Sequence, residues 1–112
     1  MLRRSRRLHT RRDFQDVWRT GRVFRGRTVI VRQRQSKLPY PRFGFVVSSV
    51  VAKKATTRNL IKRRLRAIAR AIQPAAPVDV VVYATKPAAI ATYAELERDL
   101  RHILTHPTHA SR

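Results

Sequence analysis

The chain of 112 residues contains no cysteine, only six acidic residues and no long apolar run. Without a thiol it can form neither disulfides nor a thiolate metal site, which fits a reducing compartment. No segment reaches the roughly 18 apolar residues that a membrane span needs, and no signal-peptide-like apolar run follows the basic start. We therefore expect a cytoplasmic protein that is neither crosslinked by disulfides nor inserted in a membrane.

Negative charge is scarce. The chain has 26 Lys and Arg residues but only six Asp and Glu residues, which gives a formal charge of +20. Like charges at this density repel one another in a folded chain unless a polyanion neutralises them. The cations include 21 arginines, whose planar guanidinium binds phosphate in bidentate geometry and stacks on bases. No acidic residue occurs between Asp16 and Asp79, an interval that holds 16 cations. This imbalance predicts a nucleic-acid partner.

The first half of the chain shows one helical pattern followed by extended patterns. Thr10 and Asp13 have capping-box spacing, so we expect a helix that begins here and ends at Gly21. Short apolar runs at residues 28–34 and 43–47, separated by prolines, then indicate antiparallel strands.

The second half predicts two helices around one buried strand. Residues 58–72 carry apolar side chains at helical spacing, and residues 78–84 include a β-branched run typical of a strand in the middle of a sheet. A second capping-box spacing, between Thr92 and Glu95, starts the last helix. The apolar face of the central helix comprises Ile61, Leu65, Ile68 and Ile72.

These elements follow one another in the order α-β-β-β-α-β-α, which predicts an α+β fold, a sandwich of helices packed on a sheet. With 43% apolar residues the chain has enough side chains for the core of a single domain over residues 1–112. We expect residues 1–9 and 106–112 to form flexible tails.

The side of the central helix opposite its apolar face is basic and contains no carboxylate. Cations spaced three and four residues apart repel one another, and the helix dipole disfavours them near the N-terminus. A phosphate backbone would remove both penalties. We interpret this side as a nucleic-acid-binding surface, because an ordinary solvated face mixes charges of both signs. Its polar groups are Lys53, Lys54, Asn59, Lys62, Arg63, Arg64, Arg66 and Arg70.

A second basic surface is predicted on the strand at residues 28–34. Alternation places Ile30, Arg32 and Arg34 on one face of that strand. Basic strands beside aromatic rings suit single-stranded nucleic acid, since backbone charge and base stacking tolerate any sequence. Phe14 and Trp18 could supply the rings, although aromatic residues on an apolar helix face are more often core.

Two stretches of the sequence resemble those of a known protein family. Residues 58–66 read Arg-Asn-Leu-Ile-Lys-Arg-Arg-Leu-Arg, and Phe-Gly-Phe-Val-Val-Ser precedes them at residues 43–48. This resembles the bacterial ribonuclease P protein, whose pattern is Arg-Asn-Arg-x-Lys-Arg-x-x-Arg. The Phe-x-x-Val-Trp-x-x-Gly run at residues 14–21, the Asp-Val-Val-Val strand and a terminal Glu- and Leu-rich helix follow the family's order over about residues 8 to 105.

The resemblance implies a fold and an activity. The fold would be an α-β sandwich like the second domain of ribosomal protein S5, with a left-handed strand-helix-strand crossover against the usual rule. The chain would be a subunit of ribonuclease P that assists endonucleolytic removal of the 5′ leader from precursor tRNA. Its partners would be one ribonuclease P RNA and the precursor tRNA, with no membrane and no small-molecule substrate. Magnesium would be held mainly by the RNA subunit, which would carry the catalytic centre.

The resemblance also implies roles for individual residues. Asn59 would lie near RNA-bound magnesium, and no side chain of this chain would be catalytic or a metal ligand. Two positions depart from the family: Leu60 replaces its second motif arginine, and Arg32 lies near a position that is often aromatic. The contacts to the RNA subunit would come from Arg58, Asn59, Lys62, Arg63 and Arg66, with Arg70, Lys53 and Lys54 nearby, and the leader cleft would hold Phe14, Trp18, Arg27, Arg32 and Arg34.

The sequence leaves two alternative functions open, and neither is catalysis by this chain. The chain offers no carboxylate pair suited to acid-base work, and three of its four histidines lie in the last helix or beyond it, so independent catalysis is disfavoured. A basic ribosomal or RNA-chaperone protein without a processing role would share the same composition. A DNA-binding helix protein would place the central helix in a major groove, but no dimerising segment supports it.

Overall fold

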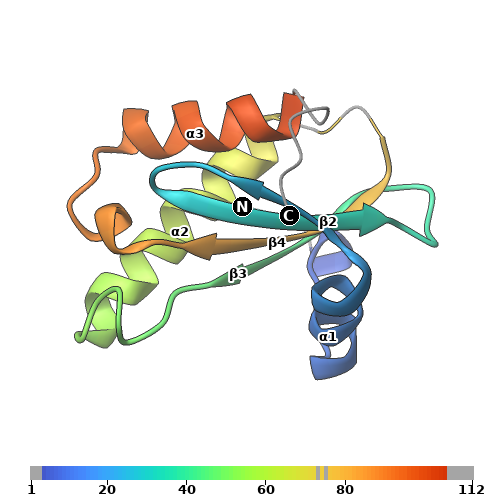
Figure 1. Cartoon of the computed structure of the whole chain (residues 1–112), viewed down its shortest axis with the longest axis horizontal. Coiled ribbons are helices and arrows are strands. Elements are labelled where there is room, and N and C mark those ends of the chain that lie inside the picture. The colour runs from blue at the N-terminus through green and yellow to red at the C-terminus, as the bar shows by residue number, and fades with distance from the viewer. Residues whose placement is uncertain (1–3, 73, 75, 106–112) are drawn as a thin grey trace.

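Four strands form one mixed sheet with helices on both of its faces (Figure 1). The computed structural model describes residues 4–72, 74 and 76–105 of the chain. The predicted α-β-β-β-α-β-α order is confirmed, with two short 3-10 helices added. The elements are η1 (Arg4–Arg6), α1 (Arg11–Thr20), β1 (Arg22–Arg25), β2 (Val29–Gln35), β3 (Arg42–Val46), α2 (Ala55–Ile72), β4 (Val78–Ala84), η2 (Lys86–Ala89) and α3 (Tyr93–Thr105).

The strands lie in the order β1-β2-β4-β3, so the last strand of the chain inserts between two earlier ones. β2 pairs antiparallel with β1 and β4, whereas β3 runs parallel to β4. The expectation of antiparallel pairing is therefore wrong for β3. Parallel neighbours need a long crossover connection, and α2 supplies it here. The central position predicted for residues 78–84 is confirmed, because Val80, Val81 and Val82 are all fully buried.

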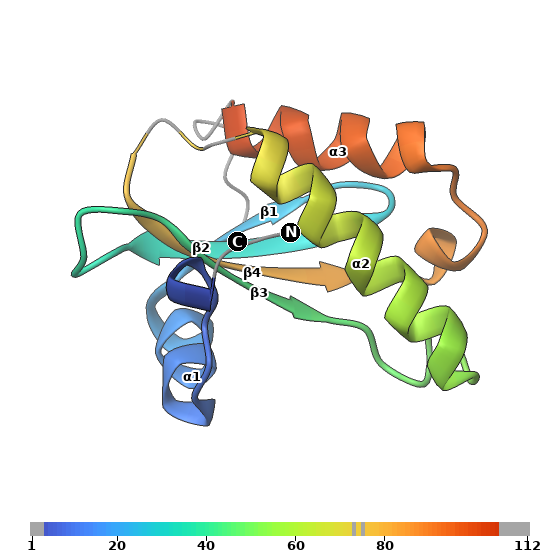
Figure 2. The same ribbon diagram turned by 180° about the vertical axis from the view of Figure 1, so that it is seen from behind.

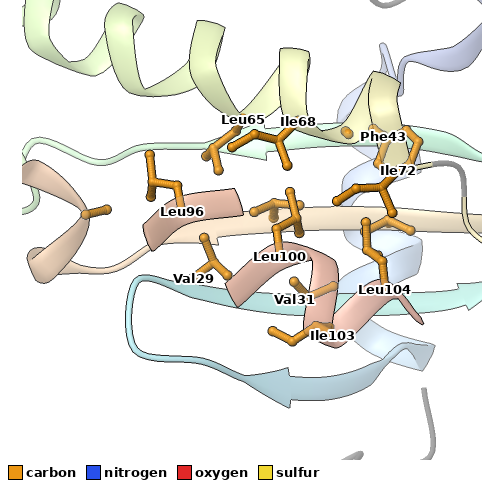
Figure 3. Packing of buried hydrophobic residues seen from close by; sticks show 14 of the residues in the cluster. Val29, Val31, Phe43, Leu65, Ile68, Ile72, Leu96, Leu100, Ile103 and Leu104 are labelled. Atoms are coloured by element: carbon orange, nitrogen blue, oxygen red, sulfur yellow. The ribbon is translucent and has the colours of Figure 1, made fainter. Parts of the chain in front are cut away.

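The main core lies between the sheet and the pair α2 and α3, while α1 packs on the opposite face (Figure 2). Leu65 and Ile68 from α2 meet Leu96 and Leu100 from α3 over the strands (Figure 3). All four side chains are fully buried. Each contributes about 1.5–3 kcal/mol of transfer free energy. The predicted apolar face of the central helix is therefore confirmed.

A smaller core cluster lies under α1 and holds Leu8, Val17 and Val81, with Phe14 partly buried against it. Gly44 of β3 makes this packing possible. A Cβ atom at that position would lie 2.5 Å from the Phe14 ring. The aromatic ring therefore rests directly on the strand backbone, and α1 lies closer to the sheet than a side chain there would allow.

Both predicted capping boxes are present. The Thr10 hydroxyl accepts the Asp13 N–H at 3.0 Å, and Thr92 forms the same exchange with Glu95. Burial by itself raises the pKa of Asp13, but hydrogen bonds from Thr10 and the nearby Arg42 charge leave that pKa below its usual value. The Thr92 hydrogen bonds likewise lower the pKa of Glu95. Local sequence thus determines where these two helices begin.

Two boundaries differ from the prediction. α2 begins at Ala55, before the predicted start at residue 58, because residues 55–57 carry no large apolar side chain that would reveal the helical period. Residues 4–9 were expected to be part of a tail, but they pack against the sheet. The Leu8 N–H donates to the Phe43 carbonyl at 2.8 Å, and the Leu8 side chain is buried. The expected tails at residues 1–3 and 106–112 lie outside the described residues.

Candidate nucleic-acid interface

The outer side of α2 is basic, as the helical period predicts. Asn59 and Arg63 are exposed and Arg66 is half-buried, whereas Ile61 and Leu65 on the other side are buried. Within the described part of the chain, Arg63 and Arg66 form no ion pair with a carboxylate. The α2 basic surface, as we call it, comprises Lys53, Lys54, Arg58, Asn59, Lys62, Arg63, Arg66 and Arg70.

Arg58 has a structural role within this surface. Its Nη1 donates to the Ala52 carbonyl at 2.9 Å and to the Lys53 carbonyl at 2.6 Å. These bonds tie the loop before α2 to the first turns of the helix. The side chains of Lys53 and Lys54 are exposed on that loop. Arg58 therefore positions two further cations at the N-terminal end of α2, where the helix dipole also attracts phosphate.

The opposite face of the sheet carries an aromatic platform, formed by Trp18, Arg32 and Tyr83. The Arg32 guanidinium carbon lies 3.7 Å from the Trp18 ring centre, and Arg32 Nη1 donates to the Trp18 carbonyl at 3.1 Å. The Tyr83 ring meets Trp18 edge-on at 5.8 Å. Burial raises the pKa of Tyr83, against the opposing effect of the Arg32 charge, so its hydroxyl stays protonated near neutral pH. Trp18 nevertheless remains 54% exposed, so one side of its ring is available for stacking.

Sequence reasoning did not identify Tyr83 as a site residue. Alternation along β4 places Tyr83 on the same face as Val81, and the register sets it opposite Ile30 of β2 and Val46 of β3. Ile30, Tyr83 and Val46 are all half-buried. No described helix covers this end of the face (Figures 1 and 2). An open and mainly apolar strip therefore continues from the aromatic platform.

Arg34, predicted in the leader cleft, takes part in a carboxylate cluster between α1 and the sheet. Asp79 is buried and accepts two hydrogen bonds from Arg42, from Nε at 3.0 Å and from Nη2 at 2.9 Å. These bonds raise the pKa of Arg42. Arg34 Nη2 lies 3.6 Å from Asp79 and 3.9 Å from Asp16 of α1. Because Asp13 also lies 3.8 Å from Arg42, two ion pairs connect α1 to the strands, and Asp79 of β4 pairs with both arginines.

The structure does not bring Arg27 to the aromatic platform, so grouping it with Trp18 is wrong. Arg27 lies at the β1–β2 hairpin, where its Nη1 is 3.4 Å from Glu95 of α3. The next residue, Thr28, donates its N–H to Asp99 of α3 at 3.0 Å. Side chains two residues apart in an extended segment point to the same face of a sheet. Arg27 therefore lies on the same side as Val29, whose side chain points to the face that α2 and α3 cover.

The donor groups of the described residues do not fit a metal centre. Within residues 4–72, 74 and 76–105, no three or more His, Cys, Asp or Glu side chains lie together as metal ligands would. His9 contacts the Arg4 carbonyl through Nε2 at 2.7 Å, and His106, which could pair with His102, lies outside the described residues. In the same part of the chain, no helix has the length and apolarity of a membrane span.

The fold and its two surfaces define a small basic α+β RNA-binding protein. The family model described as Ribonuclease P matches residues 2–108. The chain is 40% identical to the ribonuclease P protein component of Pseudanabaena, over 93% of this chain and 92% of that protein. It is 42% identical to that of Micrococcus luteus, over 88% and 85%. The chain therefore belongs to the ribonuclease P protein family.

Solved structures agree with this assignment. The ribonuclease P protein of Staphylococcus aureus superimposes with a TM-score of 0.81 at 25% identity, over 95% of this chain and 98% of that one. That of Thermotoga maritima gives 0.78 at 28% identity, over 88% and 94%. The resemblance drawn from residues 58–66 is thus confirmed, and with it the expectation of a tRNA-processing ribonucleoprotein component.

Proposed function

We propose that this chain binds the catalytic RNA of ribonuclease P through the α2 basic surface and the single-stranded leader of precursor tRNA on the aromatic platform. In this role it assists removal of the leader in the cytoplasm and carries no catalytic residue itself. The observation that carries the proposal is the combination of family membership with two separate RNA-compatible surfaces on opposite sides of one sheet.

The α2 basic surface suits a structured RNA backbone. Guanidinium groups such as that of Arg63 bind phosphate with two parallel hydrogen bonds, which are about twice as strong as neutral ones. The surface offers cations over several helical turns with no carboxylate on α2 to compete. Leu60, where the family pattern has arginine, is 38% exposed and leaves an apolar position within this surface.

The aromatic platform suits a single strand. Stacking of a base on an aromatic ring stabilises binding by about 1–3 kcal/mol without reading the sequence. Arg32 already holds the Trp18 ring in place through stacking and through its hydrogen bond to the Trp18 carbonyl. A leader nucleotide would therefore meet a ring whose orientation is set before binding, which lowers the entropic cost of association.

The chemistry of cleavage is assigned to the RNA subunit. Magnesium bound by RNA would supply the activated water, and the described residues bring together no three or more His, Cys, Asp or Glu side chains that could hold the metal. Asn59 is exposed on α2 and would lie near such RNA-bound magnesium. The contribution of the protein is binding energy and substrate orientation.

The test is single-turnover leader removal by the cognate RNA subunit at low magnesium, measured with and without the protein. We expect the protein to accelerate cleavage and to lower the magnesium concentration required. A ribosomal or RNA-chaperone protein would bind the RNA without acceleration, so binding without acceleration would refute the proposal. The doubly substituted variant Arg63→Ala with Arg66→Ala serves as the matched control and should accelerate less.

A further inference from the structure

A fourth arginine joins three arginines of α2 around one cavity. Arg7, from the segment before α1, lines a cavity of about 500 Å³ together with Arg63, Arg66, Arg70 and the small side chain of Ala67. The residues of the cavity wall include no carboxylate. Arg7 lies far from the other three in sequence and was expected to belong to a tail, so only the folded chain reveals this site.

The sheet positions Arg7. Arg7 forms a parallel bridge with Phe43, and the N–H of the next residue, Leu8, donates to the Phe43 carbonyl at 2.8 Å. The segment therefore continues the sheet beyond β3. Leu8 packs with Val17 and Val81 on the α1 side. Because consecutive residues of an extended segment point to opposite faces, Arg7 points toward α2.

Two of the arginines in this cavity, Arg7 and Arg66, have a buried nitrogen without an acceptor. In both residues this nitrogen is the Nε atom, which has no hydrogen-bond partner. Within the described residues, no carboxylate lies within ion-pair distance of Arg7, Arg63 or Arg66. Burying a donor without an acceptor is unfavourable, and neighbouring cations repel. An anion with several acceptor oxygens would relieve both costs.

We propose that this cavity binds a phosphodiester group of the RNA subunit, with Arg7 as a phosphate-binding residue beside Arg66. The inference rests on the proposed function and extends its RNA-binding surface from α2 onto the N-terminal segment. The ligand belongs to a polynucleotide because the cavity shares Arg63, Arg66 and Arg70 with the α2 basic surface. The volume accommodates a phosphate with its attached sugar. The same segment leads directly into α1, the helix that carries Trp18.

The test uses Arg7→Gln in the full chain, with Arg25→Gln as the matched control. Arg25 is exposed at the end of the edge strand β1, outside both surfaces, and the two variants lose the same charge. RNA-subunit affinity is measured across a series of monovalent salt concentrations at fixed magnesium. We expect Arg7→Gln to weaken binding roughly tenfold and to lower the salt slope by about one, as for the loss of one phosphate contact. Arg25→Gln should leave the slope unchanged.

The outcomes separate this inference from the proposed function. If the wild-type chain fails to bind the RNA subunit, both fall. If the wild type binds and Arg7→Gln behaves like Arg25→Gln, only the cavity assignment falls. If Arg7→Gln keeps its RNA-subunit affinity but loses preference for precursor over mature tRNA, the phosphate belongs to the leader and the assignment to the RNA subunit is wrong.

A second measurement does not depend on the RNA. Inorganic phosphate is titrated into the wild-type chain while the Nε–H signals of arginine are followed by NMR. We expect the Arg7 and Arg66 signals to shift together, and the Arg66 shift to diminish in Arg7→Gln. Equal small shifts at all exposed arginines, with none at Arg66, would indicate unspecific screening and would contradict a phosphate site.

Discussion

The helices α1 and α2 pack on opposite faces of the same sheet, and arginines lie beside both, but those arginines have different partners. Beside α1, Arg34 and Arg42 are paired with Asp13, Asp16 and Asp79. On the α2 side, no carboxylate of the described residues neutralises Arg63 or Arg66. In a chain with six acidic residues, their placement decides which arginines stabilise the fold and which remain available for RNA.

Removing the carboxylate of Asp79 tests whether the paired arginines beside α1 stabilise the fold. Asp79→Asn leaves Arg42 without its bidentate partner in a largely buried site, so we expect the free energy of unfolding to fall by about 3–5 kcal/mol. Urea denaturation followed by circular dichroism measures the change. The matched control is Glu97→Gln, which breaks the exposed pair with Arg101 and should cost less than about 1 kcal/mol. Equal losses in the two variants would show that the carboxylate cluster does not stabilise the fold.

Removing the stacking ring tests the aromatic platform. Trp18→Ala should reduce the preference for precursor over mature tRNA roughly tenfold, from a stacking energy of about 1–3 kcal/mol. Because Trp18 is 54% exposed, we expect little change in stability. Competition binding of the holoenzyme to the two ligands gives the ratio, and Trp18→Phe should keep most of it. An equal loss of affinity for both ligands would remove Trp18 from the leader site.

Removing one cation from α2 tests whether the arginines that no carboxylate neutralises bind RNA. Arg63→Ala should weaken binding of the RNA subunit about fivefold to tenfold, corresponding to about 1–1.4 kcal/mol, and leave the unfolding free energy unchanged. Arg98→Ala, an exposed cation of α3, is the control with the same change in charge. Filter binding and urea denaturation report the two quantities. Unfolding of the Arg63 variant would contradict the assignment of that side chain to the outer side of α2.

Acid titration tests the smallest expected effect, the contribution of Asp13 at the start of α1 to the stability of the folded state. The pKa of Asp13 lies below its ordinary value of 3.8, so its carboxylate stabilises the folded state above that pH. This stabilisation disappears as the pH falls through the lower folded-state pKa. Asp13→Asn should therefore lower Tm near neutral pH, and the difference from wild type should vanish in strong acid. Asp13→Glu keeps the carboxylate and should retain the pH dependence; a difference independent of pH would exclude this electrostatic origin.

Much of the secondary structure follows from local sequence. Thr10 with Asp13 and Thr92 with Glu95 position two helix starts, since a capping box is complete within four residues. The two faces of α2 follow from the helical period, and the burial of residues 78–84 follows from their β-branched run. The sequence alone also determined the charge imbalance and the family resemblance, because both depend on residue identity and spacing.

The tertiary structure decided which faces meet, because local periodicity shows that a strand has two faces but not what lies opposite each. Insertion of β4 between β2 and β3 placed Tyr83 beside Trp18 and Asp79 between Arg34 and Arg42. Pairing of the N-terminal segment with β3 brought Arg7 to α2. These contacts join residues far apart in the chain, so their formation depends on strand order and register, which no single stretch of sequence encodes.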